Sequence, residues 1–304
     1  MSETRDQQTA RLRITLRHLE VFVAVARAGS TRAAAERVAR SQSAASNALH
    51  DLEDALGVGL FDRVGRRLVI NESGRTLLPY AATLLDHAGG IQGLFAGGHT
   101  SVLRVGASFT IGEYLLPERL ALWKLQHEES RVLLRIGNTS EVIDAVASFD
   151  VDVGFIEGAQ THPDLLVRDW LTDELVLFTG PSHALAGASV SVRDLRSASW
   201  IMRELGSGTR EAADRWLMEQ LGHLKIEFEL GSSEAIKRLV ASGLGIGCLS
   251  RYAVAEAFQQ GWLVPLRTRL PRAVRRLALV THHSKHLGPG MAAFVEHCTM
   301  QSKA

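Results

Sequence analysis

The chain has 304 residues, of which 46% are hydrophobic and 22% charged, and its formal net charge is only +1. These proportions are typical of two or three compact domains and exclude a largely disordered chain. Because the net charge is so small, a role in binding nucleic acid must be argued from the positions of individual arginines.

Two features of the sequence indicate the cellular compartment. Only Cys248 and Cys298 occur, which predicts a reducing environment. The polar start MSETRDQQTARLR lacks the apolar core of a signal peptide, and no run of about 18 apolar residues follows it. We therefore expect a soluble cytoplasmic protein with no part in the membrane.

The first predicted element is a helix that starts near Leu16. Leu16, Leu19, Phe22 and Val23 recur at helical spacing and would form one apolar face. Gly29 then provides a C-cap for this helix. The helix can complete a small bundle with the two helices that come next.

Residues 31–56 predict two short helices that meet at a tight polar corner. In the first helix, Ala34, Ala35, Val38 and Ala39 lie on one face and are small enough for a second helix to cross close by. Ser41 would cap the second helix with its hydroxyl group. The buried stripe of the second helix consists of Ala45, Ala48, Leu49, Leu52 and Leu56. This layout is typical of a helix-turn-helix that reads DNA.

The second helix leaves polar side chains on its other face, namely Gln42, Ser43, Ser46, Asn47 and His50. The amide groups of Gln and Asn can bond two atoms of an adenine edge, and serine hydroxyls can bond bases or phosphate. An amphipathic helix pair with a solvated polar face is the alternative, because such pairs are common.

A basic hairpin is predicted directly after the helix pair. Leu60-Phe61 and Leu68-Val69-Ile70 indicate two short strands, and the turn between them carries Arg63, Arg66 and Arg67. Beside a helix-turn-helix, this pattern favours a wing whose arginines contact the DNA backbone or the minor groove. An ordinary solvated turn is the alternative.

Residues 72–99 predict one long helix. Apolar residues recur at helical spacing from Leu77 to Phe95, and such a stripe must be buried, most simply against a second copy of the chain. Pro79 should kink this helix or mark its first turn. Gly97-Gly98 would give a flexible exit at the domain boundary.

The remainder alternates strands and helices, as α/β folds do. Strands are predicted at Val102–Ala107, Val132–Ile136, Val151–Ile156, Leu175–Thr179, Ile226–Leu230, Ile246–Leu249 and Leu277–Thr281. Helices are predicted at Gly112–Gln126, Ser140–Ala147, Thr209–Leu221, Glu234–Ser242 and Tyr252–Gln260.

Hydroxyl side chains gather at four of the strand-to-helix junctions, and they include Ser108, Thr110, Thr139, Ser207, Thr209 and Ser233. Ligands of parallel sheets bind at the carboxyl ends of the strands. Hydroxyl groups, backbone N–H groups and helix dipoles at that edge could hold an anion without a lysine. The alternative is that each group merely caps its own helix.

Other motifs indicate no enzyme, metal or cofactor. Gly243-Leu-Gly245-Ile-Gly247 follows a helix and is interpreted as a C-cap, and Gly206-Ser-Gly208-Thr lacks the ending of a P-loop. His282-His283-Ser-Lys-His286 has no carboxylate or cysteine partner nearby. Cys248 is expected to be an inert core thiol. A solvated edge strand is predicted for the stretch that carries Arg267, Arg269, Arg272, Arg275 and Arg276.

The chain resembles the LysR-type transcriptional regulators from Ile14 to about Cys298. The matching segments are LRHLEVFVAVARAGS, the core AAAERV…SQSA, LFDR and NESGRTLLPYA, although Ser43 stands where the family usually has proline. The resemblance implies a winged helix-turn-helix over residues 14–71, a linker and dimerisation helix over 72–99, and an α/β periplasmic-binding-protein-like effector domain over 100–298. The effector domain would have one lobe of residues 101–171 and 267–298 and another of residues 172–266, with crossings near Leu171 and Pro265.

The partners follow from the same resemblance. It implies double-stranded promoter DNA, a small anionic effector, a second copy in a homodimer or homotetramer, and RNA polymerase. The DNA contacts carried over are Arg32, Ser41, Gln42, Ser43, Ser46, Asn47, His50, Arg63, Arg66 and Arg67.

The effector domain closely resembles the CysL/YeiE-like branch of the family, which is tied to sulfur metabolism. The segments GASFTIGEYLLP, VDVGFIEG and RELGSGTRE carry this resemblance. It implies sulfite or a related oxyanion bound by the hydroxyl residues named above, with Glu204 assigned to structure or to Arg203 and Arg210. A carbon-metabolism regulator that senses a phosphorylated metabolite is the closest alternative. A small-solute binding or enzymatic α/β protein with a helical assembly domain is the alternative from another class.

Overall fold

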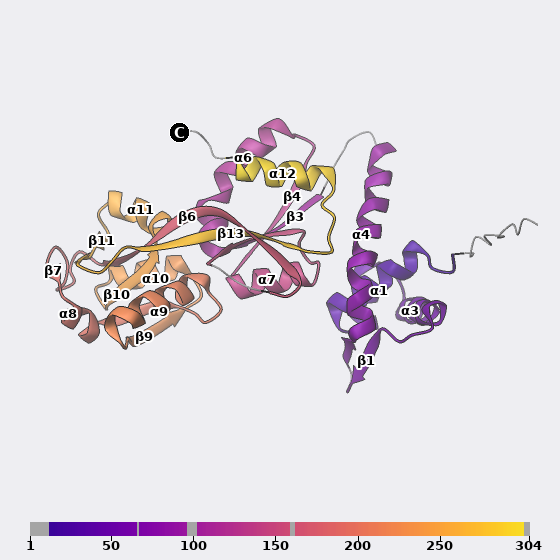
Figure 1. Cartoon of the computed structure of the whole chain (residues 1–304), viewed down its shortest axis with the longest axis horizontal. Coiled ribbons are helices and arrows are strands. Elements are labelled where there is room, and N and C mark those ends of the chain that lie inside the picture. The colour runs from indigo at the N-terminus through magenta and orange to yellow at the C-terminus, as the bar shows by residue number, and fades with distance from the viewer. Residues whose placement is uncertain (1–11, 66, 96–101, 159–161, 301–304) are drawn as a thin grey trace, which may run out of the picture. The chain divides into compact units, whose positions relative to one another are not determined.

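The computed structural model describes residues 12–65, 67–95, 102–158 and 162–300. The chain divides into a first unit, Met1–Gly97 with Ser284–His286, and a second unit, Gly98–His283 with Leu287–Ala304. Figure 1 shows the helices and strands of both units. Among the described helices, none has the length and apolar character that a bilayer crossing requires.

Three short helices build the core of the first unit. They are α1 (Leu16–Ala28), α2 (Thr31–Arg37) and α3 (Gln42–Leu56). The hydroxyl oxygens of Thr15, Ser30 and Ser41 cap them by accepting from backbone N–H groups. Gly29 ends α1 with a φ of 66°, a left-handed conformation that glycine adopts without strain.

Small side chains let these helices approach one another closely, as predicted. Ala34 on α2 and Ala45 on α3 are fully buried, as are Phe22 on α1 and Leu52 on α3. Ala39 differs from the prediction, because α2 ends at Arg37 and Ala39 is exposed in the corner with a φ of 51°. The apolar pattern in the sequence therefore continues beyond the last residue of the helix.

A two-stranded hairpin and a long helix complete the first unit. Strands β1 (Phe61–Val64) and β2 (Arg67–Ile70) pair antiparallel, as the predicted wing requires. Helix α4 runs from Glu72 to Phe95, so the rest of the predicted span 72–99 lies outside the described residues. Pro79 lies inside the helix and does not mark its first turn. Leu78 and Ala81 are buried, whereas Leu84 and Ile91 are 51% and 59% exposed.

The second unit is built on one mixed sheet with strand order β4-β3-β5-β13-β6-β10-β8-β9. Its long strands are β3 (Val102–Ser108), β4 (Arg131–Gly137), β5 (Val153–Glu157), β6 (Leu165–Thr179), β8 (Ser199–Arg203), β9 (Lys225–Leu230), β10 (Ile246–Ser250) and β13 (Ala273–His282). Short strands are β7 (Ser189–Val190), β11 (Val264–Pro265) and β12 (Arg267–Thr268). The helices are α5 (Phe109–Tyr114), α6 (Leu116–Gln126), α7 (Thr139–Ala147), α8 (Val192–Ser197), α9 (Gly208–Leu221), α10 (Ser233–Ala241), α11 (Arg251–Gln259) and α12 (Pro289–Thr299).

Strand β6 belongs to two lobes. Its first part pairs with β13, with Leu165 opposite His282, and its last part pairs with β10, with Thr179 opposite Ile246. In Figure 1, β6 and β13 run side by side from one lobe into the other. Each lobe keeps parallel strands of its own, β4-β3-β5 in the first and β10-β8-β9 in the second.

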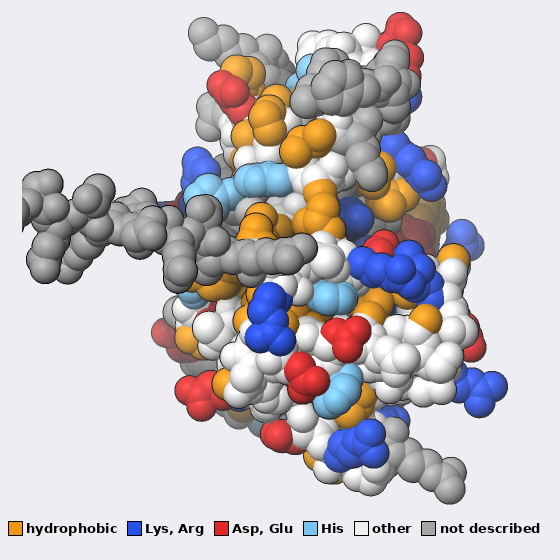
Figure 2. All heavy atoms as spheres, turned by 90° about the vertical axis from the view of Figure 1, so that its right-hand side faces the viewer, with side chains coloured by type: hydrophobic (Ala, Val, Ile, Leu, Met, Phe, Trp, Pro, Cys, Tyr) orange, Lys and Arg blue, Asp and Glu red, His pale blue; other side chains and the backbone are white. Residues whose placement is uncertain are grey.

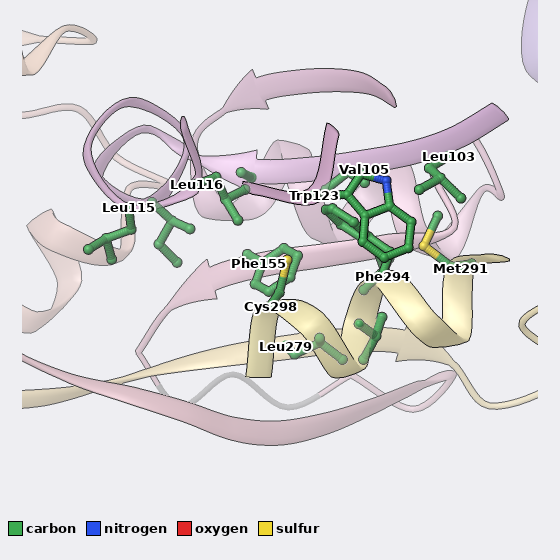
Figure 3. Packing of buried hydrophobic residues seen from close by; sticks show 14 of the residues in the cluster. Leu103, Val105, Leu115, Leu116, Trp123, Phe155, Leu279, Met291, Phe294 and Cys298 are labelled. Carbon is green, nitrogen blue, oxygen red and sulfur yellow. The ribbon is translucent and has the colours of Figure 1, made fainter. Parts of the chain in front are cut away.

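Each lobe has its own apolar core. In the first lobe, Trp123, Phe155 and Phe294 pack between the sheet and α12, as Figure 3 shows. In the second lobe, Leu270 and Ala273 still pack against the cluster around Trp200. The chain therefore returns to the first lobe after Ala273, later than the crossing expected near Pro265.

Two predictions about this unit were wrong. The helix expected at Gly112–Gln126 is broken into α5 and α6 at Leu115, where Pro117 in the first turn of α6 prevents a continuous helix. The arginine stretch does not form a single edge strand: Arg267 lies on the short strand β12, whereas Arg275 and Arg276 lie on β13, between β5 and β6 in the middle of the sheet. Arg275 on this strand is buried.

Candidate functional site

The polar face of α3 lies in solvent. Gln42, Ser43, Ser46, Asn47 and His50 are all exposed. On the opposite face Ala45, Ala48, Leu49 and Leu52 are buried, whereas Leu56, which was also expected to be buried, is only half-buried at the end of the helix. Ser41 uses its hydroxyl oxygen to accept from the N–H of Ala44 at 3.2 Å. The start of α3 also presents backbone N–H groups, and with the helix dipole these favour a phosphate group.

The charged side chains near this face are also exposed. The side chains of Arg32, Arg63 and Arg67 are exposed to solvent, whereas Arg66 lies outside the described residues. His50 lies 3.5 Å from Asp54, a pair so exposed that it adds little stability. In the face shown in Figure 2, Lys and Arg side chains alternate with acidic, histidine and uncharged side chains. The three described arginines of the predicted DNA-contact set are therefore accessible from solvent.

The hydroxyl residues predicted at the strand-to-helix junctions of the second unit are all buried. They are Ser108, Thr110, Thr139, Ser207, Thr209 and Ser233. Ser207 caps α9 by accepting from the N–H of Arg210. The caps of α7 and α10 are the neighbouring residues Asn138 and Ser232, so Thr139 and Ser233 keep their hydroxyl groups for other partners. Helix capping therefore does not explain the set.

A carboxylate from the end of β5 lies among these hydroxyl residues. Glu157 accepts a hydrogen bond from the backbone N–H of Thr110 at 3.2 Å and a very short one from the hydroxyl of Thr209. Arg275 donates to the same carboxylate at 2.8 Å and to the Thr209 oxygen at 3.0 Å. Thr110 follows β3 in the first lobe and Thr209 begins α9 in the second, so Glu157 joins the two lobes.

The charge of Glu157 is stabilised in spite of its burial. Burial by itself raises the pKa of Glu157, but the Arg275 guanidinium and the hydrogen bonds from Thr209 and Thr110 outweigh it and lower the pKa to about 2. Arg275 is held in turn by Asp173, which accepts from its Nε at 2.7 Å and from the Ser250 hydroxyl at 2.8 Å. The site thus contains two buried carboxylates around one guanidinium.

Backbone contacts bring the helix N-termini of the two lobes together. The hydroxyl of Thr139 on α7 accepts from the N–H of Gly208 on α9 at 3.2 Å, and the N–H of Ser140 donates to the carbonyl of Gly206 at 3.1 Å. A Cβ at Gly208 would lie 2.3 Å from the carbonyl oxygen of Glu157, so only glycine fits at this contact. The lobes therefore meet at the predicted anion site.

Two further hydroxyl groups border the site. The Ser108 hydroxyl is buried and has no hydrogen-bond partner among the described residues. Ser233 accepts from Nη1 of Arg203 at 3.4 Å, and Arg203 lies over the ring of Phe109 at 4.8 Å. Glu204 pairs with Arg203 at 2.8 Å, as predicted, whereas Arg210 pairs instead with Asp214 and Glu229.

Sequence reasoning missed Glu157, Asp173 and Arg275. All three lie inside strand patterns, and a charged residue within an apolar strand was the available signal. Within the described residues, no group of His, Cys, Asp and Glu could hold a metal ion. Cys248 is buried, and burial raises the pKa of its thiol to about 12, so it is an inert thiol.

Comparison with known proteins agrees with this architecture. Residues 16–75 match the model for the "Bacterial regulatory helix-turn-helix protein, lysR family", and residues 96–303 match the "LysR substrate binding domain". The "Uncharacterized HTH-type transcriptional regulator YeiE" of Escherichia coli strain K12 is 45% identical over 287 residues, which cover 94% of this chain and 98% of that one.

Two other relatives carry information in their names. The "HTH-type transcriptional regulator CysL" of Bacillus subtilis is 32% identical over 77% of this chain and 79% of its own length. The Synechocystis CcmR regulatory domain, solved in complex with 2-PG, is 26% identical with a TM-score of 0.61, and the match covers 66% of this chain and 98% of that one.

Proposed function

The chain belongs to the LysR family of ligand-responsive transcriptional regulators, and on this premise we propose that its effector is a small oxyanion held where the two lobes meet. The family consists of DNA-binding regulators and not of enzymes. The observation that carries the proposal is that Glu157 bonds both Thr110 and Thr209, next to the contact between Thr139 and Gly208, while the Ser108 hydroxyl is buried without a hydrogen-bond partner among the described residues.

The buried carboxylate restricts the kind of oxyanion. A fully deprotonated anion beside Glu157 would suffer repulsion, because two like charges at close range in a buried site are strongly unfavourable. An oxyanion that carries a proton can donate it in a hydrogen bond to Glu157 and accept bonds from the hydroxyl groups. Hydrogen sulfite carries such a proton, whereas sulfate does not. Sulfite is therefore the favoured effector, in line with the resemblance to the branch that includes CysL.

DNA contact is proposed for the exposed face of α3 and for the wing. Gln42 and Asn47 have the amide groups that read adenine, and the exposed Arg63 and Arg67 can hold the backbone. The remaining members of the proposed set are Arg32, Ser41, Ser43, Ser46, His50 and Arg66.

Signal transfer is proposed to run through paired subunits. Leu84 and Ile91 leave an apolar stripe on α4 that a second copy of the helix would cover. An oxyanion that binds the closed lobes better than open ones shifts the population toward closure. Closure would then change how effector domains pack and so alter the spacing of the two DNA readers and the access of RNA polymerase.

Calorimetric titration of the full-length protein tests the ligand. We expect sulfite to bind, sulfate to bind at least tenfold more weakly, and Thr209→Val to weaken sulfite binding by about five- to tenfold, as loss of one hydrogen bond implies. Thr299→Val is the matched control, because among the described residues the Thr299 hydroxyl bonds only to carbonyl groups of α12. Equal affinities in wild type and Thr209→Val would contradict the site.

A phosphorylated metabolite is the second candidate ligand, and the 2-PG complex of the CcmR domain favours it. Phosphate monoesters can also carry a proton and fit the same argument from Glu157. Preference for 2-phosphoglycolate over sulfite in the same titration would select this candidate.

A further inference from the structure

Helix α5 belongs to the first lobe by its core residues but contacts the second lobe at both ends. Ile111 and Leu115 are buried in the apolar cluster of the first lobe. The ring of Phe109, the first residue of α5, lies 4.8 Å from the guanidinium of Arg203, which ends β8 in the second lobe. Tyr114, the last residue of α5, packs against an apolar cluster built from α10, α11 and the sheet of the second lobe.

Tyr114 makes two different contacts with α10 of the second lobe. Its hydroxyl donates to the Glu234 carboxylate at 2.6 Å, and its ring centre lies 5.2 Å from Nζ of Lys237. Lys237 is only 5% exposed, and its ammonium group pairs with Glu234 and donates to the carbonyl of Ala253 at 2.9 Å. One side chain of the first lobe therefore forms a charge-assisted hydrogen bond and a cation–π contact with an ion pair that the second lobe holds in place.

The ionisation states of these groups suit the contact. Burial, followed by the hydrogen bond to Glu234 and the charge of that carboxylate, raises the pKa of Tyr114, so the phenol keeps the proton that it donates. Burial by itself raises the pKa of Glu234, but hydrogen bonds from Lys237 and Tyr114 outweigh it and lower that pKa. The donor is therefore neutral and the acceptor ionised at neutral pH.

The contact lies beside a groove, so it can open without leaving a buried group unpaired. The groove has a volume of about 640 Å³, runs between α10 and α11, and is lined by Tyr114, Glu234, Lys237, Ala253 and Ala257 among others. Tyr114 is half-buried, and the Glu234 side chain is 45% exposed. Water can replace the Tyr114 hydroxyl at Glu234 when the lobes separate, which makes the contact reversible.

We propose that Tyr114 is a clasp between the lobes, a positioning residue that stabilises the closed effector domain without contacting the effector. The inference rests on the proposed function only where it concerns the effector. An effector that binds the closed form has an apparent affinity that falls with the fraction of molecules already closed. The clasp raises that fraction before any effector binds.

Amide hydrogen exchange in the full-length protein without any ligand, followed residue by residue, tests the clasp. The N–H groups of Ser140 and Gly208 donate across the lobe junction, to the Gly206 carbonyl and the Thr139 hydroxyl, so they exchange when the lobes separate. Tyr114→Phe removes the hydroxyl and keeps the ring, and both amides should exchange about three- to tenfold faster because one hydrogen bond to a charged group is lost. Tyr114→Leu removes both contacts and should accelerate the exchange further.

Two controls separate a clasp from a general loss of stability. Tyr252→Phe alters a tyrosine that lines the same groove from α11, within the second lobe, and should leave the exchange of Ser140 and Gly208 unchanged. The amide of Leu217, inside α9, should exchange equally slowly in wild type and in Tyr114→Phe. Unchanged exchange of Ser140 and Gly208 in both Tyr114 variants would overturn the clasp, as would an equal acceleration at Leu217 or in Tyr252→Phe.

Added sulfite distinguishes the clasp from the effector proposal. Sulfite at about ten times its dissociation constant should slow the exchange of Ser140 and Gly208 by about tenfold in wild type and in Tyr114→Phe, because it binds only the closed form. Absence of this slowing in both proteins would contradict sulfite as the effector. The ligand-free comparison would still decide whether Tyr114 holds the lobes together.

Discussion

Replacing Glu157 by glutamine tests the buried ion pair at the lobe junction. The pKa of Glu157 falls from 4.5 to about 2 in the folded protein. Each factor of ten in proton affinity corresponds to about 1.4 kcal/mol, so the ionised carboxylate stabilises the fold by about 3 kcal/mol. Glutamine keeps the shape and can still accept from Thr209, but among the described residues it leaves Asp173 as the one carboxylate paired with Arg275. For a unit of this size, we expect the melting temperature to fall by about 6–12 °C.

The pH dependence gives this prediction its sign. Because the folded pKa is lowered, the stabilisation is fully present above the ordinary pKa of 4.5 and is lost as the pH falls toward 2. The difference between wild type and Glu157→Gln should therefore shrink to about half by pH 3. Scanning calorimetry at pH 7 and pH 3 measures it, with Glu118→Gln, an exposed carboxylate, as the control. A pH 7 melting temperature within 1 °C of wild type would refute the reasoning.

Four other results are expected. Glu157→Gln should bind sulfate more tightly than wild type does in calorimetry, because the repelling carboxylate is gone; unchanged discrimination between sulfate and sulfite would remove Glu157 from the selection. Gly208→Ala should bind sulfite more than about tenfold more weakly than wild type. The added Cβ would lie 2.3 Å from the Glu157 carbonyl oxygen and would prevent the lobes from meeting. An unchanged sulfite affinity would show that lobe closure is not needed for binding. The double variant Leu84→Asp, Ile91→Asp should sediment as a smaller species than wild type. Both side chains are exposed on α4, where the proposed subunit interface would cover them, and two carboxylates there would disfavour pairing. An unchanged sedimentation coefficient would place the interface elsewhere. Gln42→Ala with Asn47→Ala should weaken binding to a selected duplex in a gel-shift assay by about 1–3 kcal/mol per lost contact, with Gln126→Ala as the control, and equal shifts would contradict base reading by α3.

The buried and exposed faces of α3 could be predicted in detail from the sequence. Buried and exposed residues of α3 alternate with the period of a single helix, so Ala45 and Leu52 could be assigned to the core and Asn47 to the surface without tertiary information. Ser41 could be recognised as the N-cap because it is a serine and directly precedes the first residue of the helix. The end of the preceding helix at Arg37 was misjudged, since an alanine run does not show where a helix stops, and Leu56 was expected to be buried but is half-buried.

The ion pair at the lobe junction could not be predicted in this way. Glu157 and Arg275 are separated by more than a hundred residues and meet because β5 and β13 are neighbours in the sheet. Strand order is a tertiary property, so the sequence shows Arg275 only as one of several arginines in a basic stretch. The hydroxyl residues were predictable as a set because each lies where a strand gives way to a helix, but Glu157, which bonds Thr110 and Thr209, was not.

The groove beside Lys237 was hidden for a related reason. Alanines such as Ala253 and Ala257 fit any helix, and they form a groove only when α10 and α11 lie side by side. Lys237 occurs on a helix with otherwise regular amphipathic spacing, so its burial becomes evident only in the folded unit.

Footprinting of the full-length protein on its promoter DNA, with and without sulfite, tests the central claim most directly. We predict that sulfite changes the protected pattern for wild type and leaves it unchanged for Thr209→Val, while both proteins still protect the DNA. One pattern for both proteins across sulfite, sulfate and phosphate would contradict an oxyanion signal at the lobe junction.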